Sequence, residues 1–289
     1  MANILDLRRR IRSVRNTQQI TRAMKMVAAA RLRRAQQRVV NARPYAAEIR
    51  ALLASAAARV DGAEQAAHPL LAVRPERETL LVLVTADRGL CGAFNANLIR
   101  AAQAYLSERA AQPVELLAVG RKGRDYFRKR SVPIIDEHVD IFARLEYAHA
   151  RAIAAKIIEL FSSGVVDAVD FLYNEFKSIA TQRLVVERQL PVKPVDPLPG
   201  ETLVDYIYEQ PPAEIFRRLV PRYVEAQVYR TLLESQAAEL AAKLTAMDAA
   251  TRNAGEMIDT LTMTMNRVRQ AAITKEIIEI VSGAAAQEE

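Results

Sequence analysis

The sequence predicts a mixed fold, in which the two ends of the chain form a long antiparallel two-helix coiled coil and an α/β domain is inserted between its halves. Apolar residues recur at alternating spacings of three and four residues at each end. Between the ends, apolar runs alternate with helical patterns. We expect an N-terminal shaft helix over residues 1–60, an α/β domain over 77–205 and a C-terminal shaft helix over 212–284.

The N-terminal stripe runs without a gap from Ile4 to Val60. Its apolar members are Ile4, Leu7, Ile11, Val14, Ala28, Leu32, Ala35, Val39, Ala42, Ala46, Ile49, Leu53, Ala56 and Val60. Three consecutive stripe positions, Gln18, Thr21 and Lys25, are polar, and none of the twelve arginines in the first fifty residues falls on the stripe. This pattern is typical of a coiled-coil seam, which Pro44 should kink or open locally.

The C-terminal stripe has the same period. Its positions are Leu219, Tyr223, Ala226, Arg230, Leu233, Ala237, Leu240, Leu244, Met247, Thr251, Ala254, Ile258, Leu261, Met265, Val268 and Ala272. At 1.5 Å per residue each end makes a rod of roughly 80–100 Å, too long to fold back on one globular core. The two helices should therefore pack on each other, and they should be antiparallel because one leads into the middle and the other leads out.

The middle of the chain predicts a Rossmann-like α/β domain with a mostly parallel sheet. Strands are expected at 79–85, 114–120 and 166–173, with a possible further strand at 183–190. Helices are expected at 93–111, 121–130 and 143–162. The proline-rich stretch 190–200 cannot be helical and should connect this domain to the C-terminal helix.

Charge is concentrated at the N-terminus. The whole chain carries +7, but residues 1–50 hold thirteen Lys and Arg against only Asp6 and Glu48, a local +11 that leaves −4 for the rest. This segment fits a nucleic-acid arm, a transit peptide, or a helix surrounded by acidic surface. A single cysteine, Cys91, and three histidines predict no disulfide framework and no metal site, and no apolar run is long enough to span a membrane.

The stretch TLLVLVTADRGLCGAFNANLI, residues 79–99, poses the question of nucleotide binding, because a strand, a glycine loop and a helix are how many proteins hold phosphate. Gly89 and Gly92 lack the lysine and hydroxyl of a Walker loop, and the dinucleotide fingerprint is also missing. The segment VGRKGRDYF, 119–127, leaves a phosphate site conceivable. Cys91, Asp87 and Glu115 have no catalytic partner in the sequence, so we expect a turn or contact surface, no cofactor and no catalytic residue.

Several blocks in both helices resemble the gamma subunit of the bacterial F-type ATP synthase, the central-stalk rotor. The segments 20–36 and 269–286 are similar to the two ends of that family, and Ile273, Thr274, Glu276, Glu279, Gly283 and Ala284 match its C-terminal signature. RPYA, DRGLCG, DYIYE and RYVEAQVY look like further family blocks in the right order. The resemblance covers essentially the whole chain.

The resemblance implies a non-catalytic shaft inside a ring of three alpha and three beta subunits, with the α/β domain as a foot on the epsilon subunit and the membrane c ring. Proton flow turns the ring and the shaft, and the asymmetric shaft drives ATP synthesis or hydrolysis in beta. Acidic loops on the ring would suit the N-terminal cations. The chain would then be peripheral, on the cytoplasmic face of the bacterial plasma membrane, since it lacks a cysteine-bearing chloroplast insert and a transit peptide.

Residues that match the family pattern are the expected partner contacts. Those toward the alpha/beta hexamer are Met24, Lys25, Arg269, Gln270, Thr274 and Glu276, and those toward the c ring and epsilon are Tyr206 and Tyr208. Met24 could equally pack in the seam, Arg269 could lie on a solvated face, and the two tyrosines could be core. The alternative functions are a nucleotide-binding α/β protein and a basic coiled-coil nucleic-acid-binding protein.

Overall fold

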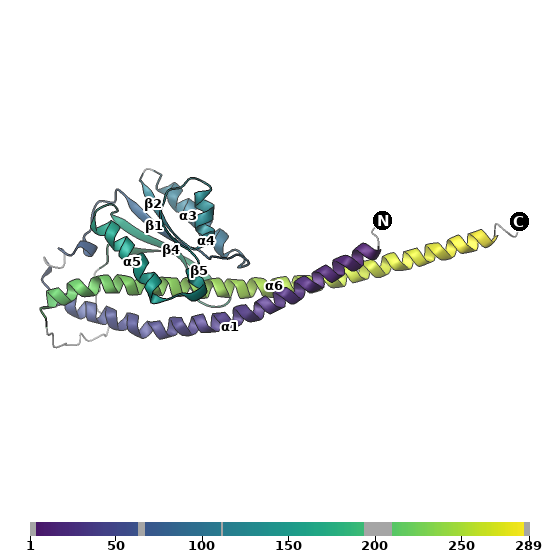
Figure 1. The fold of residues 1–289 in the computed structure, drawn as a ribbon, viewed down its shortest axis with the longest axis horizontal. Helices are drawn as coiled ribbons and strands as arrows, with labels where there is room; N and C mark the ends of the chain where they lie inside the picture. The colour runs from purple at the N-terminus through teal and green to yellow at the C-terminus, as the bar shows by residue number, and fades with distance from the viewer. Residues whose placement is uncertain (1–3, 63–66, 111, 194–209, 286–289) are drawn as a thin grey trace. The chain divides into compact units, whose positions relative to one another are not determined.

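The computed structural model describes residues 4–62, 67–110, 112–193 and 210–285 (Figure 1). The chain forms two compact units. One combines Met1–Ala28 with Leu244–Glu289, and we call its described part the coil segment; the other is Ala29–Lys243. Helices α1 (Ile4–Ala57) and α6 (Pro212–Ala285) contribute to both units.

The unit Ala29–Lys243 contains a five-stranded sheet in the order β3-β2-β1-β4-β5. The strands are β1 (Thr79–Val84), β2 (Val114–Val119), β3 (Ile134–His138), β4 (Ala168–Phe176) and β5 (Gln182–Leu190). Pairs β1–β2, β1–β4 and β2–β3 are parallel, and only β4–β5 is antiparallel. This confirms the predicted fold class, including the mostly parallel sheet.

Strand β3 is the element that the sequence did not predict. Its segment, IIDEH, has only two apolar residues and three polar ones, so it lacks the apolar run that marked the other strands. It lies at the edge of the sheet and is only partly buried, unlike the fully buried central strand β1. A continuous apolar sequence is needed only where both faces of a strand are buried, and the faces of this edge strand are partly exposed.

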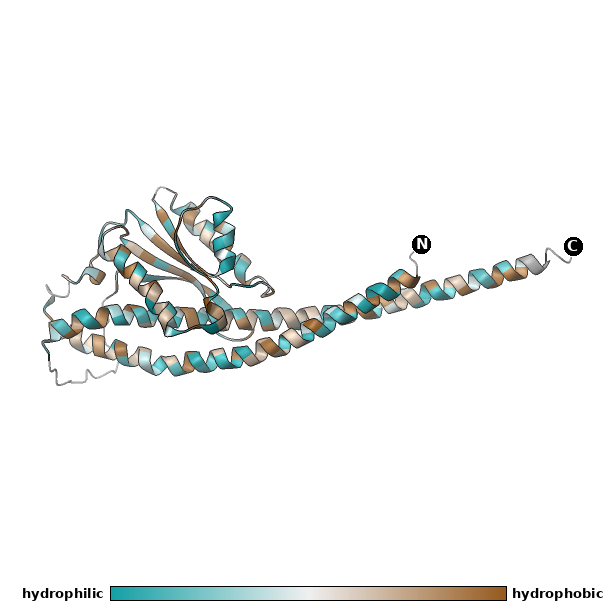
Figure 2. Cartoon of the chain, viewed as in Figure 1, coloured by the Kyte–Doolittle hydropathy of each residue, from teal (hydrophilic) through white to brown (hydrophobic). Residues whose placement is uncertain are grey.

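Three helices connect the parallel strands: α3 (Phe94–Glu108), α4 (Arg121–Arg128) and α5 (Tyr147–Ser162). Short 3₁₀ turns η1 (Pro69–Leu71) and η2 (Ile141–Arg144) precede β1 and α5. Figure 2 shows the apolar colour of the sheet strands, and a buried cluster joins Leu81 and Leu83 of β1 to Leu98 of α3, Phe127 of α4 and Ala238 of α6.

Part of helix α6 is buried on all sides. Every residue from Thr231 to Leu240 is buried, including several polar ones. Contacts to the sheet domain satisfy some of these: the Phe176 amide donates to Glu234 at 3.2 Å, and Gln236 Nε2 donates to the Phe142 carbonyl at 2.8 Å. A helix without an exposed face belongs to the core of its domain, so α6 is as much a part of the α/β domain as of the coiled coil.

In the coil segment, α1 and α6 pack antiparallel. Lys25 meets Asp248 and Thr21 meets Thr251, so the numbering falls on one helix as it rises on the other. Every predicted stripe position from Ile4 to Ala56 on α1, and Val60 just after this helix, is buried or half-buried. The sequence therefore predicted the packed face of this helix correctly, and α1 continues as helix through Pro44.

Candidate functional site

The carboxyl ends of β1 and β4 are where an α/β sheet of this order would bind a nucleotide, because the strand order reverses there. The Asp87 carboxylate follows β1, but it binds the segments that follow β2 and β3, on the side of β1 away from β4. Its Oδ1 accepts hydrogen bonds from the amides of Arg121, at 3.1 Å, and Asp140, at 2.8 Å, and Oδ2 accepts from the Phe142 amide at 3.4 Å. Since Arg121 is the first residue of α4, an internal acid occupies the anion-binding position at the N-terminus of this helix.

The glycines near this edge serve close packing. Gly120 has φ +90°, and a Cβ there would lie 2.0 Å from the Thr85 carbonyl oxygen. A Cβ on Gly123 would lie 2.9 Å from Thr85 Oγ1, which accepts the Gly123 amide at 2.8 Å. The segment VGRKGRDYF thus needs glycine so that α4 can approach β1, and its spacing does not indicate phosphate binding.

Cys91 is placed as a structural residue. The thiol is buried, Asn95 Nδ2 donates to its sulfur at 3.1 Å, and burial raises the pKa of the thiol. Because the thiolate is the reactive form, this environment makes Cys91 a poor nucleophile. Within the described residues, no group of His, Cys, Asp and Glu side chains is arranged to hold a metal ion.

Removing the Asp87 carboxylate should destabilise the domain. We expect Asp87→Ala to lower the free energy of unfolding by about 1–2 kcal/mol, the usual effect of losing a helix N-terminal cap. Inorganic phosphate should restore part of the loss in Asp87→Ala, since an anion can replace the carboxylate at the freed amides, and should not stabilise the wild type. Urea unfolding of both chains with and without phosphate measures this. Equal stability of the two chains, with no phosphate effect on either, would contradict it.

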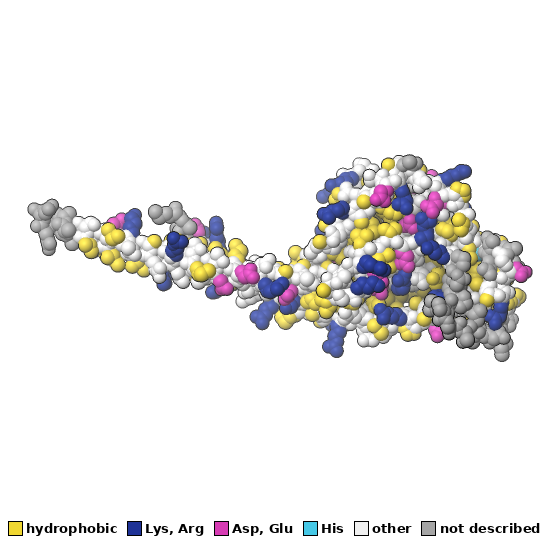
Figure 3. All heavy atoms as spheres, turned by 180° about the vertical axis from the view of Figure 1, so that it is seen from behind, with side chains coloured by type: hydrophobic (Ala, Val, Ile, Leu, Met, Phe, Trp, Pro, Cys, Tyr) yellow, Lys and Arg dark blue, Asp and Glu magenta, His cyan; other side chains and the backbone are white. Residues whose placement is uncertain are grey.

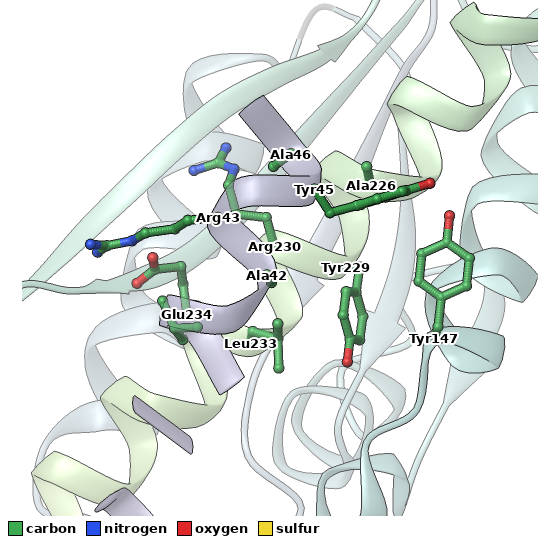
Figure 4. Close-up of a pocket in the computed structure, with 11 residues that line it drawn as sticks. Ala42, Arg43, Tyr45, Ala46, Tyr147, Ala226, Tyr229, Arg230, Leu233 and Glu234 are labelled. Atoms are coloured by element: carbon green, nitrogen blue, oxygen red, sulfur yellow. The ribbon is translucent and has the colours of Figure 1, made fainter. Parts of the chain in front are cut away.

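A cavity of about 580 Å³ lies between α1, α6 and the start of α5 within the unit Ala29–Lys243 (Figure 4). Its walls include Val39, Ala42, Ala46, Ala226 and Leu233, three tyrosines, and the charged residues Arg43, Arg230 and Glu234. The tyrosines come from three helices, so the sequence could not indicate that they meet. Figure 4 shows the hydroxyl groups of Tyr45 and Tyr147 pointing toward each other.

Most polar groups of this cavity already have partners in the chain. Tyr147 donates to Glu225 at 2.9 Å and its ring meets Tyr229 edge to face at 5.3 Å, while Arg230 binds both oxygens of Glu187 at 2.7 and 2.9 Å. Burial raises the pKa of Glu234, against the opposing effects of the Phe176 amide and two arginines. The residues that line the cavity bond the helices to the sheet. Among these described residues, no nucleophile lies next to a base.

The expected partner residues of the coil segment differ in their burial and in whether they already pair within the chain. Met24 is half-buried beside the seam. Lys25 Nζ donates to Asp248 Oδ1 at 2.5 Å, although both side chains remain about two-fifths exposed, at 43% and 41%. Lys25 therefore pairs within the chain, a contact that the sequence did not indicate because Asp248 is 223 residues away.

Toward the C-terminus of α6, Arg269, Gln270, Thr274 and Glu276 are all exposed. Thr274 Oγ1 donates to the Gln270 carbonyl at 2.9 Å, a bond within the helix. The same stretch exposes large apolar side chains: Ile273, Ile277, Ile278, Ile280 and Val281. Tyr206 and Tyr208 lie outside the described residues.

The surface of the coil segment is rich in cations. The exposed arginines of its N-terminal helix are Arg8, Arg9, Arg10, Arg12, Arg15 and Arg22. Figure 3 shows Lys and Arg side chains projecting from this segment with apolar surface between them. Exposed cations beside an exposed apolar helix end are typical of surfaces that bind other proteins.

Comparison with known proteins defines the class. The ATP synthase family model matches residues 3–287. The chain is 55% identical to the ATP synthase gamma chain of Solibacter usitatus over 100% of both chains, and 50% identical to that of Moorella thermoacetica over 98% and 99%. The chain therefore belongs to the ATP synthase family, and its place in that family is with the gamma chains, which confirms the predicted resemblance.

Solved structures agree with this assignment. The chain is similar to one from the central stalk and c ring of the Tetrahymena thermophila mitochondrial ATP synthase, with a TM-score of 0.61, 26% identity, and coverage of 80% of this chain and 99% of that one. A chain of the Euglena gracilis enzyme shares the fold, with a TM-score of 0.68 at 20% identity over 98% and 94% of the two chains. Within the described ranges, no helix combines the length and apolarity needed to span a membrane.

Proposed function

We propose that this chain is the central-stalk rotor subunit of a proton-translocating F-type ATP synthase and that it couples rotation of the c ring to ATP synthesis or hydrolysis. The observation that carries the proposal is full-length identity of 55% to a protein named ATP synthase gamma chain. The central-stalk origin of a structural neighbour supports it. The subunit itself is non-catalytic, and the occupation of the anion-binding position of α4 by Asp87 supports this part of the proposal.

The partners follow from the surfaces. The alpha and beta subunits, three of each, surround the shaft, and their acidic loops face the N-terminal arginines. Met24, Lys25, Arg269, Gln270, Thr274 and Glu276 are the proposed contacts with this hexamer. The exposed state of the last four supports their role, whereas Lys25 would have to share its charge with Asp248.

The α/β domain is the proposed foot. Residues 77–205 would contact the epsilon subunit and the c ring, with Tyr206 and Tyr208 at that interface, while 1–60 and 212–284 form the shaft. The chain would then be a peripheral protein on the cytoplasmic face of the bacterial plasma membrane. Neither a nucleotide-binding enzyme nor a nucleic-acid-binding coiled coil is favoured by any contact described above.

The ATPase activity of purified alpha and beta subunits tests the proposal. We expect the chain to be inert alone, to co-purify with them near three to three to one, and to raise or stabilise their activity. A chain lacking the residues beyond Thr274 serves as the matched variant, which should still assemble but transmit rotation less well. ATP hydrolysis or tight ATP binding by the isolated chain would contradict the non-catalytic role.

A further inference from the structure

The polar interruption of the seam falls at a single level of the coil segment. Gln18, Thr21 and Lys25 are the stripe positions of α1 that are not apolar. Opposite them α6 supplies Asp248, Thr251 and Gly255. We call these six residues the polar layer.

The polar layer combines contacts between the two helices with hydrogen bonds inside each helix, and Thr251 Oγ1 lies 2.7 Å from the Met247 carbonyl oxygen of α6. Thr21 is only 9% exposed, and Thr251 Oγ1 lies 2.9 Å from Thr21 Oγ1. Thr21 Oγ1 in turn donates to the Gln18 carbonyl at 3.0 Å. The bond from Lys25 lowers the pKa of Asp248.

Gly255 of α6 lies opposite the Gln18 side chain of α1. A Cβ at this position would lie 3.2 Å from Gln18 Nε2, tighter than an ordinary contact, and Gln18 Nε2 lies 3.4 Å from the Thr251 carbonyl oxygen. Glycine is among the least favourable residues in a helix interior, and at this position the end of the Gln18 side chain lies against it. A groove of about 410 Å³ marks the same level.

The N-terminal part of the seam in the coil segment is apolar. On α1, Ile4, Leu7, Ile11 and Val14 face the apolar stripe of α6, and apolar side chains of similar size pack acceptably when shifted by one heptad. A shift of seven residues, about 10 Å, would place Thr21 beside Ile258 or Leu244 instead of Thr251. Either shift would remove the contact between the Thr21 and Thr251 hydroxyls and separate Lys25 from Asp248.

We propose that the polar layer fixes the axial register of the two helices and holds it while the chain transmits torque. Turning two helices that are wound around each other pushes them to slide along their common axis, and an apolar seam resists sliding only weakly. A single polar residue in a coiled-coil seam is known to specify register in this way. The torque-bearing part of the inference rests on the proposed function, whereas the register part does not.

Disulfide trapping in the full-length chain tests the register. Thr21→Cys is paired with Thr251→Cys for the observed register, and with Ile258→Cys or Leu244→Cys for the two shifts. A disulfide requires Cα atoms within about 7 Å, so a heptad shift separates the registers clearly. Native Cys91 is buried and stays in all variants.

With the other layer residues intact, only the Thr21→Cys/Thr251→Cys pair should close. When Gln18, Lys25 and Asp248 are replaced by leucine, at least one shifted pair should close as well. If the leucine variant still closes only the observed pair, the polar layer does not set the register and the proposal is wrong. Circular dichroism shows whether each variant keeps its helices.

Charge exchange in the assembled complex tests the role under torque. Lys25→Asp or Asp248→Lys alone should reduce proton pumping per ATP hydrolysed while hydrolysis continues, and the double exchange Lys25→Asp/Asp248→Lys should restore pumping. Pumping that is unchanged in both single variants would overturn this part. A wild-type chain that fails to assemble with alpha and beta would contradict the proposed function and would leave the disulfide result unaffected.

Discussion

Replacing Gly120 with alanine should reduce the free energy of unfolding by about 3 kcal/mol or more, because it combines a strained φ with a collision against backbone. The added Cβ would lie 2.0 Å from the Thr85 carbonyl oxygen, and φ is +90°. The Thr85 carbonyl oxygen belongs to the backbone and cannot rotate away as the end of a side chain could. To remove the collision, β2 and α4 would have to move away from β1. Urea unfolding of the full-length chain, followed by circular dichroism, measures the loss.

Gly89→Ala is the matched control. Gly89 lies in the loop after β1, but its Cβ would meet only Lys122 Cε at 3.9 Å, an ordinary contact. We expect this variant to stay within about 0.5 kcal/mol of the wild type, as surface substitutions usually do. If both alanine variants unfolded at the same urea concentration, close packing would not explain why residue 120 is glycine.

Replacing Asp170 with alanine should have the second large effect, about 3 kcal/mol, the lower end of the range for breaking a buried ion pair. Asp170 is buried on β4, accepts the Tyr105 hydroxyl at 2.5 Å and binds Arg188 of β5 at 2.5 and 3.3 Å. Burial and then the bond to Asp170 raise the pKa of Tyr105, so the phenol remains a donor at neutral pH. The substitution would leave that buried hydroxyl without its acceptor.

Glu76→Ala removes the other partner of Arg188 and serves as the control. Arg188 also binds Glu76, at 2.7 and 3.3 Å, and the Glu76 side chain is 41% exposed. An exposed pair of this kind contributes about 1 kcal/mol or less. Thermal or urea unfolding should therefore rank the wild type and Glu76→Ala close together and Asp170→Ala well below. A loss in Glu76→Ala as large as that in Asp170→Ala would show that burial of Asp170 is not what matters.

Periodicity predicted the long helices and the buried strands because burial on a fixed face leaves a regular trace in the sequence. The seam from Ile4 to Val60 is such a trace, and β1 is another. Strand β3 was not predicted because its sequence is short and more than half polar, so it carries no apolar run. It is held in the sheet by pairing with β2. Burial of α6 between 231 and 240 was also not predicted, because the stripe indicated a single packed face.

The site was harder to predict because its groups come from distant parts of the chain. The missing Walker pattern argues against a phosphate loop, but no feature of the sequence indicates that Asp87 reaches the amides of Arg121, Asp140 and Phe142. The polar seam positions were visible as an interruption, but their partners on α6 were not. Only the fold brings together residues such as Thr21 and Thr251, which are 230 residues apart.

The same separation has a consequence for how the chain is made. A ribosome releases the α1 stripe first and the residues that cover it last, so Leu7 and Ile11 have no mate in the coil segment until Leu244 and the residues after it have emerged. Pairing over such a distance is slow compared with local folding. During synthesis the N-terminal segment therefore exposes an unpaired apolar stripe until the C-terminal residues that cover it have emerged.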